Sequence, residues 1–361
     1  MNRKVTRTAA GLVITLICSL SYSQGLNGLT EKILPLSDGV IAADGSGDYL
    51  TLREAVDAVP DNSHDRTVLF MRKGIYREKV FIPATKKNLT LIGEDADSTV
   101  IVWDDYSGRI VEGEEINTFT SQTIRIEPDD FRAMNLTFAN DARPGGTGDG
   151  QNVAVSTYGK RQVFLHCKMI SWQDTYYTGS YGRTHLKDCW IEGAVDYIFG
   201  HATAVFDSCQ IHTVRSGGYI TAASTGAGYQ FGYVFFYCRL TAPPDYNGVY
   251  LGRPWKNHPR TVFFQCVEYE NITPAGWRTW GGTEENAFYA EYQCTGPGSD
   301  TSRRVEWSRQ LTREEASSYE LENIFSSETS PDFATNWHPQ AEEDTLYKLV
   351  KAHKAPRNIL P

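Results

Sequence analysis

The chain has 361 residues, of which 40% are hydrophobic and 12% aromatic, and it carries a formal net charge of −9. This composition is typical of a globular protein with a large core and excludes a disordered or fibrous chain. The acidic balance argues against binding of nucleic acid and of anionic membrane surfaces.

Residues 1–24 have the pattern of a secretory signal peptide. Arg3, Lys4 and Arg7 precede the apolar stretch AAGLVITLICSL, and the small residues of SYSQ offer a cleavage site. About a dozen apolar residues are too few to cross a bilayer, which takes about 20; an uncleaved anchor is the alternative. Cleavage would remove three positive charges and take the net charge from −9 to −12. We expect an exported protein, periplasmic or extracellular, with one domain over residues 25–361 and no membrane contact.

A short helix is expected near the start of this domain, within YLTLREAVDAVP. Thr51 is placed as its N-cap, and Glu54 is the matching partner in a capping box. Its apolar face would comprise Leu52, Ala55, Val56 and Val59. Such a helix would cap one end of the structure that follows.

Short β-like runs that contain cysteine recur along the chain. They are FLHCKMI, LKDCWI, FDSCQI, FFYCRL and FFQCVE, with Cys167, Cys189, Cys209, Cys238 and Cys266 spaced 22, 20, 29 and 28 residues apart. TVLFM, LTLIG and FRAMNLTF fit earlier coils of the same repeat. Turn signals separate the runs, and helix-period patterns are lacking between them. We therefore predict an all-β fold, a right-handed parallel β-helix over about residues 40–310, with inward-facing cysteines and short capping helices at the ends.

The sequence leaves the state of Cys189 and Cys209 open. These residues lie about one coil apart, so their Cα atoms could come within the separation that a disulfide requires. In an exported protein, a bridge and a pair of free thiols are both compatible with this spacing.

The pattern becomes helical in the last part of the chain, and we expect a C-terminal helical tail over residues 311–361. LTREEASSYELENIF begins with a second capping box, formed by Thr312 and Glu315. DTLYKLVKAH is predicted as a last short helix. The segment SSETSPDFATNWHPQAEED between them is expected to be a surface loop or tail.

Four polar motifs lie in the β region. GQNVAV, SWQDTYY, AVDYIFG and YLGRPW carry Gln151, Gln173, Asp174, Asp196, Arg253 and Trp255. Gln151 and Gln173 are 22 residues apart, as are Asp174 and Asp196, so in coils of that length they would share one surface. The chain has no G-x-S-x-G, H-E-x-x-H or P-loop lysine motif, and its histidines do not cluster at metal spacing.

Asp196 lies between two apolar runs in WIEGAVDYIFGHATAVF, a segment without Lys or Arg. A buried carboxylate costs several kcal/mol unless another group pairs with it. Strand alternation would put Asp196 on the same face as Ile198 and opposite to Phe199, which does not decide whether Asp196 points inward or outward.

These motifs resemble those of the pectin methylesterase (pectinesterase) family, whose pattern includes Q-A-V-A-L, Q-D-T-L, D-F-I-F-G and L-G-R-P-W. DGSGDY, GIYREKV and GWRTWGG also resemble family signatures, so the similarity covers roughly residues 40–310. The chain departs from the pattern at Asn152, Tyr176 and Tyr197, where the family has Ala, Leu and Phe. The resemblance implies a right-handed parallel β-helix and a secreted member of the bacterial type.

The resemblance further implies hydrolysis of the methyl esters of galacturonate in pectin, by a monomer that needs no metal or organic cofactor. Asp196 would attack the ester carbonyl, and Asp174 would act as general acid and then as general base. Gln151 and Gln173 would donate hydrogen bonds to the oxyanion, and Arg253 would keep Asp196 charged. Substrate contacts are implied for Trp255, Phe199 and Thr118, and Tyr176 lies close enough to Asp174 to affect sugar preference.

Two other classes of protein fit parts of this pattern. A polygalacturonase or pectate lyase shares the fold, but FGHA lacks the second glycine of the expected G-H-G, and no cluster of calcium-binding acids is found. A non-catalytic polysaccharide-binding β-helix would keep Trp255 but would not need Asp174, Asp196 and Arg253 together.

Overall fold

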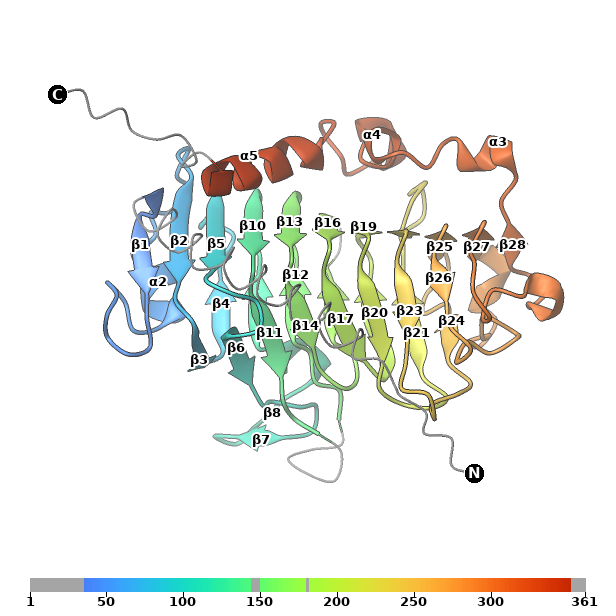
Figure 1. Cartoon of the computed structure of the whole chain (residues 1–361), viewed down its shortest axis with the longest axis horizontal. Coiled ribbons are helices and arrows are strands. Elements are labelled where there is room, and N and C mark those ends of the chain that lie inside the picture. Colours follow the sequence, from blue (N-terminus) through green and yellow to red (C-terminus); the bar gives the residue numbers. More distant parts are fainter. Residues whose placement is uncertain (1–35, 144–149, 180–181, 352–361) are drawn as a thin grey trace, which may run out of the picture.

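The computed structural model describes residues 36–143, 150–179 and 182–351, with backbone alone for 348–351. The predicted signal peptide, residues 1–24, lies outside this part of the chain. The described residues form an elongated stack of coils in which three parallel sheets run along the long axis (Figure 1). The prediction of an all-β, right-handed parallel β-helix is confirmed.

Each complete coil contributes one strand to each of three sheets, here called sheets A, B and C, and sheet A continues beyond the other two at the ends of the stack. Sheet A contains β1 (Gly39–Ile41), β2 (Thr67–Met71), β5 (Leu89–Gly93), β10 (Phe131–Met134), β13 (Gln162–Leu165), β16 (Arg183–Lys187), β19 (Thr203–Asp207), β22 (Tyr233–Phe236), β25 (Arg260–Phe264), β27 (Phe288–Tyr292) and β28 (Arg309–Gln310). Sheet B contains β3 (Gly74–Arg77), β6 (Thr99–Trp103), β11 (Thr137–Asn140), β14 (Lys168–Ile170), β17 (Trp190–Gly193), β20 (Gln210–Thr213), β23 (Arg239–Thr241) and β26 (Val267–Glu268). Sheet C contains β4 (Val80–Ile82), β9 (Ile124–Ile126), β12 (Val155–Thr157), β15 (Tyr176–Thr178), β18 (Val195–Gly200), β21 (Tyr219–Ala223) and β24 (Tyr250–Gly252).

Short elements fill some of the connections. β7 (Ile110–Val111) and β8 (Glu114–Glu115) form an antiparallel hairpin that projects from the stack (Figure 1). Single 3-10 turns cover Thr118–Thr120, Thr283–Asn286, Thr301–Arg303 and Ser327–Thr329.

The sequence repeat suggested that the cysteines lie inside strands. In the structure they lie instead in the bend between sheets A and B. In each of these coils a residue with φ between 48° and 56°, such as His166 or Asp188, precedes the cysteine. This left-handed residue turns the chain sharply and directs the next side chain into the core. The buried thiols form the predicted ladder; for example, the thiol of Cys189 donates to the carbonyl of Phe164 one coil earlier. Cys294, which sequence reasoning missed, continues the ladder.

No disulfide joins Cys189 to Cys209, and both are free thiols, as are the other cysteines of the described chain. Rings also stack from coil to coil inside the solenoid. Phe206, Phe235 and Phe263 lie with successive ring centroids 4.4 Å apart and nearly parallel planes. Residues of the same type at equivalent positions of successive coils therefore stack on one another along the solenoid.

The N-terminal end of the core is covered by α2 (Leu52–Ala58), as predicted. Thr51 and Glu54 form the expected capping box, and the helix buries Leu52, Ala55 and Val56. The prediction that this helix caps the solenoid is confirmed.

The C-terminal segment does not cap the other end, which corrects the expectation from the sequence. It turns back along the outer face of sheet A with α3 (Arg313–Ala316), α4 (Leu321–Ile324) and α5 (Pro339–Lys351), as Figure 1 shows. Thr312 and Glu315 form the predicted capping box of α3. Apolar residues on the outside of sheet A pack against the tail in one cluster that includes Val163, Val205, Val234, Ile324, Phe325 and Trp337.

The expectation of a surface loop or tail over residues 326–344 is correct only for its middle part, residues 330–338, which has no helix or strand. The whole segment contains a 3-10 turn and the start of α5, and it buries Phe333 and Trp337. Outward-facing valines on sheet A need an apolar cover, and the ring of Trp337 supplies part of it.

Candidate active site

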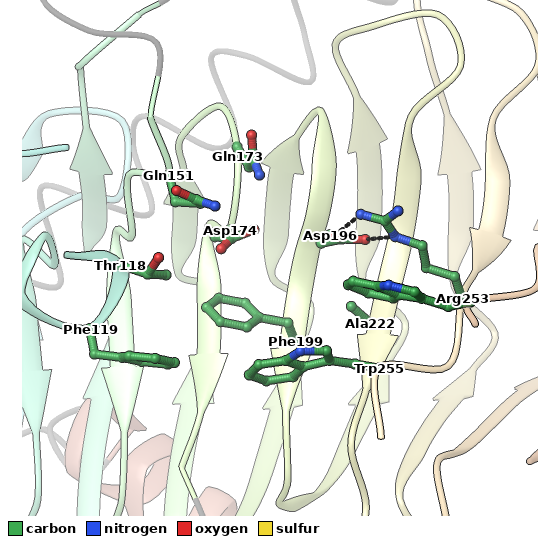
Figure 2. Close-up of a pocket in the computed structure, with 11 residues that line it drawn as sticks. Thr118, Phe119, Gln151, Gln173, Asp174, Asp196, Phe199, Ala222, Arg253 and Trp255 are labelled. Carbon is green, nitrogen blue, oxygen red and sulfur yellow. Dashed lines mark hydrogen bonds and ion pairs between the residues drawn. The ribbon is translucent and has the colours of Figure 1, made fainter. Parts of the chain in front are cut away.

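A cleft of about 290 Å³ opens on the outer face of sheet C (Figure 2). Eight of the residues proposed from the sequence line it: Thr118, Gln151, Gln173, Asp174, Asp196, Phe199, Arg253 and Trp255. Phe119, Ala222 and Trp280 complete the lining. The structure therefore brings together residues that the sequence spreads over more than a hundred positions.

The stacking of coils places the two aspartates side by side. Neighbouring strands pair so that Tyr176 lies beside Ile198. Just before these strands, the backbone N–H of Asp174 donates to the carbonyl of Val195 at 3.0 Å. The shared spacing of 22 residues therefore puts Asp174 and Asp196 at equivalent positions of successive coils, as predicted.

Both aspartates adopt the left-handed backbone region, with φ of 64° for Asp174 and 49° for Asp196. The pairing of β18 with β21 shifts register between Val195 and Ile198, so the alternation of faces is interrupted there. Tyr197 and Ile198 both lie in the core, whereas Asp196 and Phe199 face the cleft. Because of this irregularity, the side chain of Asp196 points outward into the cleft, which strand alternation alone could not decide.

Arg253 pairs with Asp196 in a two-point arrangement, shown by the dashed lines in Figure 2. Its Nε lies 2.9 Å from Oδ1 and its Nη2 2.5 Å from Oδ2 of the carboxylate. The guanidinium is held in turn between two rings, with its central carbon 4.2 Å from the centroid of Tyr219 and 3.9 Å from that of Trp280. The expected counterion for the buried charge of Asp196 is therefore present and fixed in place.

The two carboxyl groups differ in their electrostatic surroundings. Burial raises the pKa of Asp174 well above its usual value, and the nearby charge of Asp196 raises it further. Burial also raises the pKa of Asp196, but the hydrogen bonds and charge of Arg253 act in the opposite direction. The arrangement favours a protonated Asp174 beside an ionised Asp196.

Asn152, where the family pattern has alanine, connects the two glutamine positions. Its side-chain oxygen accepts from the backbone N–H of Gln173 at 3.0 Å, and its amide nitrogen donates to the carbonyl of Ala142 at 2.8 Å. Asn152 is only 1% exposed and follows Gln151 directly. This departure from the pattern therefore adds a buried link that positions Gln151 and Gln173 relative to one another.

Tyr176 does not reach the cleft, which corrects the expectation that it contacts substrate. It is fully buried in the core, where its hydroxyl lies 3.2 Å from that of Thr157. Adjacent strand residues face opposite sides, so the next residue, Tyr177, reaches the outer face and packs against Phe199 with ring centroids 4.8 Å apart. Tyr177 and Phe199 are 22 residues apart, the spacing that the two aspartates share, and this was the sequence signal for their pairing.

Two aromatic residues of the cleft were also missed. Phe119 follows Thr118 in the NTFTSQT motif, is 40% exposed, and contacts Tyr177 with centroids 5.1 Å apart. Trp280 belongs to the GWRTWGG motif, which had been noted without choosing a residue. Both could have been found, since each lies within or beside a motif already identified.

Among the residues that the structure describes, no group of three or more His, Cys, Asp or Glu side chains is arranged to hold a metal ion. Within the same part of the chain, no helix has the length and apolar character needed to span a bilayer.

Comparisons with known proteins place the chain in a family. The Pectinesterase family model matches residues 38–328. Pectinesterase 31 from Arabidopsis thaliana is 39% identical over 284 residues, which cover 76% of this chain and 88% of that protein.

Solved structures agree with this match. The structure of pectin methylesterase from carrot has a TM-score of 0.73 and 36% identity, covering 80% of this chain and 92% of that chain. Pectin methylesterase PemA from Erwinia chrysanthemi has a TM-score of 0.69 and 25% identity, with coverage of 80% and 96%. Because the plant proteins are the more similar of these, the expected bacterial type stays a prediction. The chain belongs to the pectinesterase family.

Proposed function

We propose that this pectinesterase uses Asp196 as its nucleophile and Asp174 as its acid and base. Family membership makes the chain a carboxylic ester hydrolase that removes methyl groups from pectin. The observation that supports the residue roles is the pairing of Arg253 with Asp196 next to a second buried carboxyl group, in a cleft open to solvent.

In the first step, an oxygen of Asp196 attacks the carbonyl carbon of the methyl ester, and the bond from that carbon to the methoxy oxygen breaks. Asp174 gives its proton to the departing oxygen, which leaves as methanol. The products of this step are a mixed anhydride between Asp196 and the galacturonate and an ionised Asp174.

In the second step, Asp174 accepts a proton from water as the oxygen of that water attacks the acyl carbon. The bond to Asp196 breaks, the galacturonate leaves with a free carboxyl group, and Asp196 is again a carboxylate beside Arg253. Asp174 ends protonated, so both groups return to the states that their surroundings favour.

Gln151 and Gln173 are the proposed donors to the oxyanion formed in each step. They line the cleft on the side of Asp174, away from Arg253 (Figure 2). An oxyanion donor typically contributes about 3–4 kcal/mol to stabilising such a transition state. Trp255, Phe199 and Thr118 are the proposed contacts for the sugar rings, and Trp255 and Phe199 pack together with centroids 5.9 Å apart.

The same proposal includes export and action as a monomer. Export is supported by the pattern of a signal peptide in residues 1–24, whose positive start and short apolar stretch are typical of exported proteins. Export matches a polymeric substrate, which does not cross a membrane to reach an enzyme.

Methanol release from highly methylated pectin, with and without a chelator, tests the proposed chemistry. We expect release at the same rate in both conditions, because the proposed steps use two carboxyl groups and no metal. An unsaturated product that absorbs ultraviolet light would indicate a lyase, and new reducing ends would indicate a polygalacturonase. Loss of activity with the chelator would contradict the proposed mechanism.

A further inference from the structure

A row of outward-facing residues continues from the cleft across sheet C toward the first coils. Strand pairing places Phe199 beside Tyr177, Tyr177 beside Ser156, Ser156 beside Arg125, and Arg125 beside Phe81. Residues paired in this way share one face of a parallel sheet. The row therefore runs along the axis of the solenoid on the same surface as the aspartates.

The side chain of Ser156 is too small to contact its neighbours in the row. The ring of Tyr158 fills this gap and makes the row continuous. The ring of Tyr158 lies 5.8 Å from the ring of Tyr177 between centroids. The guanidinium carbon of Arg125 lies 4.4 Å from the centroid of Tyr158 and 5.8 Å from that of Phe81. We call Phe81, Arg125 and Tyr158 the distal strip; none of the three lines the cleft itself.

The distal strip is accessible and carries little net charge. Phe81 is 53% exposed, although a phenylalanine gains by burial. The Arg125 side chain is 33% exposed and pairs with Glu127, its Nε lying 2.7 Å and its Nη2 2.5 Å from one carboxylate oxygen. Because Glu127 offsets the charge of Arg125, the surface presents flat, polarisable groups without a free cation. Such a surface suits an uncharged sugar ring better than a carboxylate.

We propose that the distal strip is an additional subsite for methyl-esterified residues of the same polymer chain whose ester is cleaved in the cleft. This inference rests on the proposed function. From β18 to β4 the row crosses four strand spacings, or about 19 Å at roughly 4.8 Å each, a length that several linked sugar residues would span. Esterification removes the charge of galacturonate, which matches the compensated charge of the strip.

The proposal predicts that long chains gain binding energy that short ones cannot reach. The measured quantity is the ratio of kcat/KM for long, highly methylated pectin to kcat/KM for fully methylated trigalacturonate. We expect Phe81→Ala to lower this ratio about fivefold, the size of one stacking contact. The double variant Arg125→Gln/Glu127→Gln removes both charges together, so that neither is left unpaired, and should lower the ratio by a similar factor.

Arg239→Gln is the matched control. Arg239 is also an exposed arginine over a tyrosine, with its guanidinium carbon 5.6 Å from the centroid of Tyr269, but it lies on sheet B. The Arg239→Gln variant should have the same ratio of kcat/KM values as the unaltered protein. Thermal unfolding of all variants should show the same Tm within a few degrees. An unchanged ratio in both strip variants, with the fold intact, would overturn the proposal.

A third substrate tests the preference for esters. With sparsely methylated pectin, the effect of Phe81→Ala should be smaller than with highly methylated pectin; an equal or larger effect would contradict binding of the esterified residues. Failure of the unaltered protein to release methanol from highly methylated pectin would contradict the proposed function instead, so the two failures are distinguishable.

Discussion

The outer faces of sheets A and C both carry apolar side chains, but only the face of sheet A is covered by another part of the chain. On sheet A, apolar residues such as Val163 and Val205 are covered by the tail of the same chain, which adds Phe325 and Trp337 to their cluster. On sheet C, the rings of Tyr177 and Phe199 form a small cluster, and Phe199 lines a cleft that stays open. An aromatic outer face therefore indicates a binding surface only where the chain itself provides no cover.

Two arginines show the same contrast. Arg183 on sheet A is 1% exposed, and its Nη1 donates to the carbonyls of Phe325 and Thr335 in the tail. Burial lowers its pKa to about 10. Arg253 beside sheet C pairs instead with the carboxylate of Asp196. The first arginine holds the tail against sheet A, and the second pairs with the carboxylate that we propose as the nucleophile.

The largest expected loss of activity comes from substituting Asp196 in the cleft. Asp196→Asn replaces the proposed nucleophile with a group of nearly the same shape, so methanol release should fall by at least about 10⁴-fold while the fold survives. The measurement is methanol release with circular dichroism of the same sample. A variant with normal activity would remove Asp196 from the proposed role.

Asp174→Asn should lower methanol release by about 10²–10⁴-fold, the usual contribution of a general acid and base. It should also stabilise the protein at neutral pH. The folded-state pKa of Asp174 is raised, so its contribution to stability is present below the unfolded value and is lost as pH rises through the folded value. The unfolding free energy of the unaltered protein should therefore fall with rising pH more than that of the variant.

Denaturant unfolding at several pH values measures this difference. If both proteins show the same dependence on pH, Asp174 does not hold a proton in the folded state, and the assignment of the acid would be wrong.

Arg253→Met should reduce activity by about 10²-fold, because it leaves Asp196 buried without its counterion. Without the arginine, the pKa of Asp196 rises, so the acidic limb of the pH–rate profile should move to higher pH. Arg278→Met is a control, since Arg278 contacts the ring of Tyr250 and no carboxylate of the cleft. An unshifted acidic limb would show that Arg253 does not set the charge of Asp196.

Asn152→Ala should have a smaller effect, lowering kcat/KM roughly threefold to tenfold. The change removes the acceptor of the Gln173 N–H and leaves buried backbone groups without partners, a loss of about 1–3 kcal/mol in stability. Kinetics on pectin and a denaturant titration check both values. Unchanged kinetics would mean that Asn152 does not position Gln173 for catalysis.

Arg183→Met should leave kcat within about twofold but lower the unfolding free energy by about 2–3 kcal/mol, since two carbonyls of the tail lose their donor. Limited proteolysis should then cut within residues 326–338 first. If activity fell as sharply as stability, the covered face and the open face would not be independent.

Much of the fold was predictable from sequence because local and repeated signals agree. The capping boxes of Thr51 and Thr312 act within four residues, and the cysteine runs repeat the same thiol-to-carbonyl contact in successive coils from Cys189 to Cys294. The aspartate pair was predictable for a similar reason, since equal spacing becomes adjacency in a stack.

The remaining features depend on geometry that spacing does not contain. The choice between Tyr176 and Tyr177 depends on which face of β15 points inward, and the direction of Asp196 depends on a register shift in β18. The path of the tail depends on surface complementarity between residues more than a hundred positions apart, such as Arg183 and Phe325. None of these three features is visible as a pattern of neighbouring residues in the sequence.

The ion pair between Asp196 and Arg253 joins residues 57 positions apart, and Arg253 follows β24, two strands beyond β18 in sheet C. A chain that has wound only as far as β21 therefore holds Asp196 without a counterion. If Asp196 is the nucleophile as proposed, the protein becomes active only when the coil that carries Arg253 docks. A protein truncated before that coil would then keep most of the solenoid but be inactive.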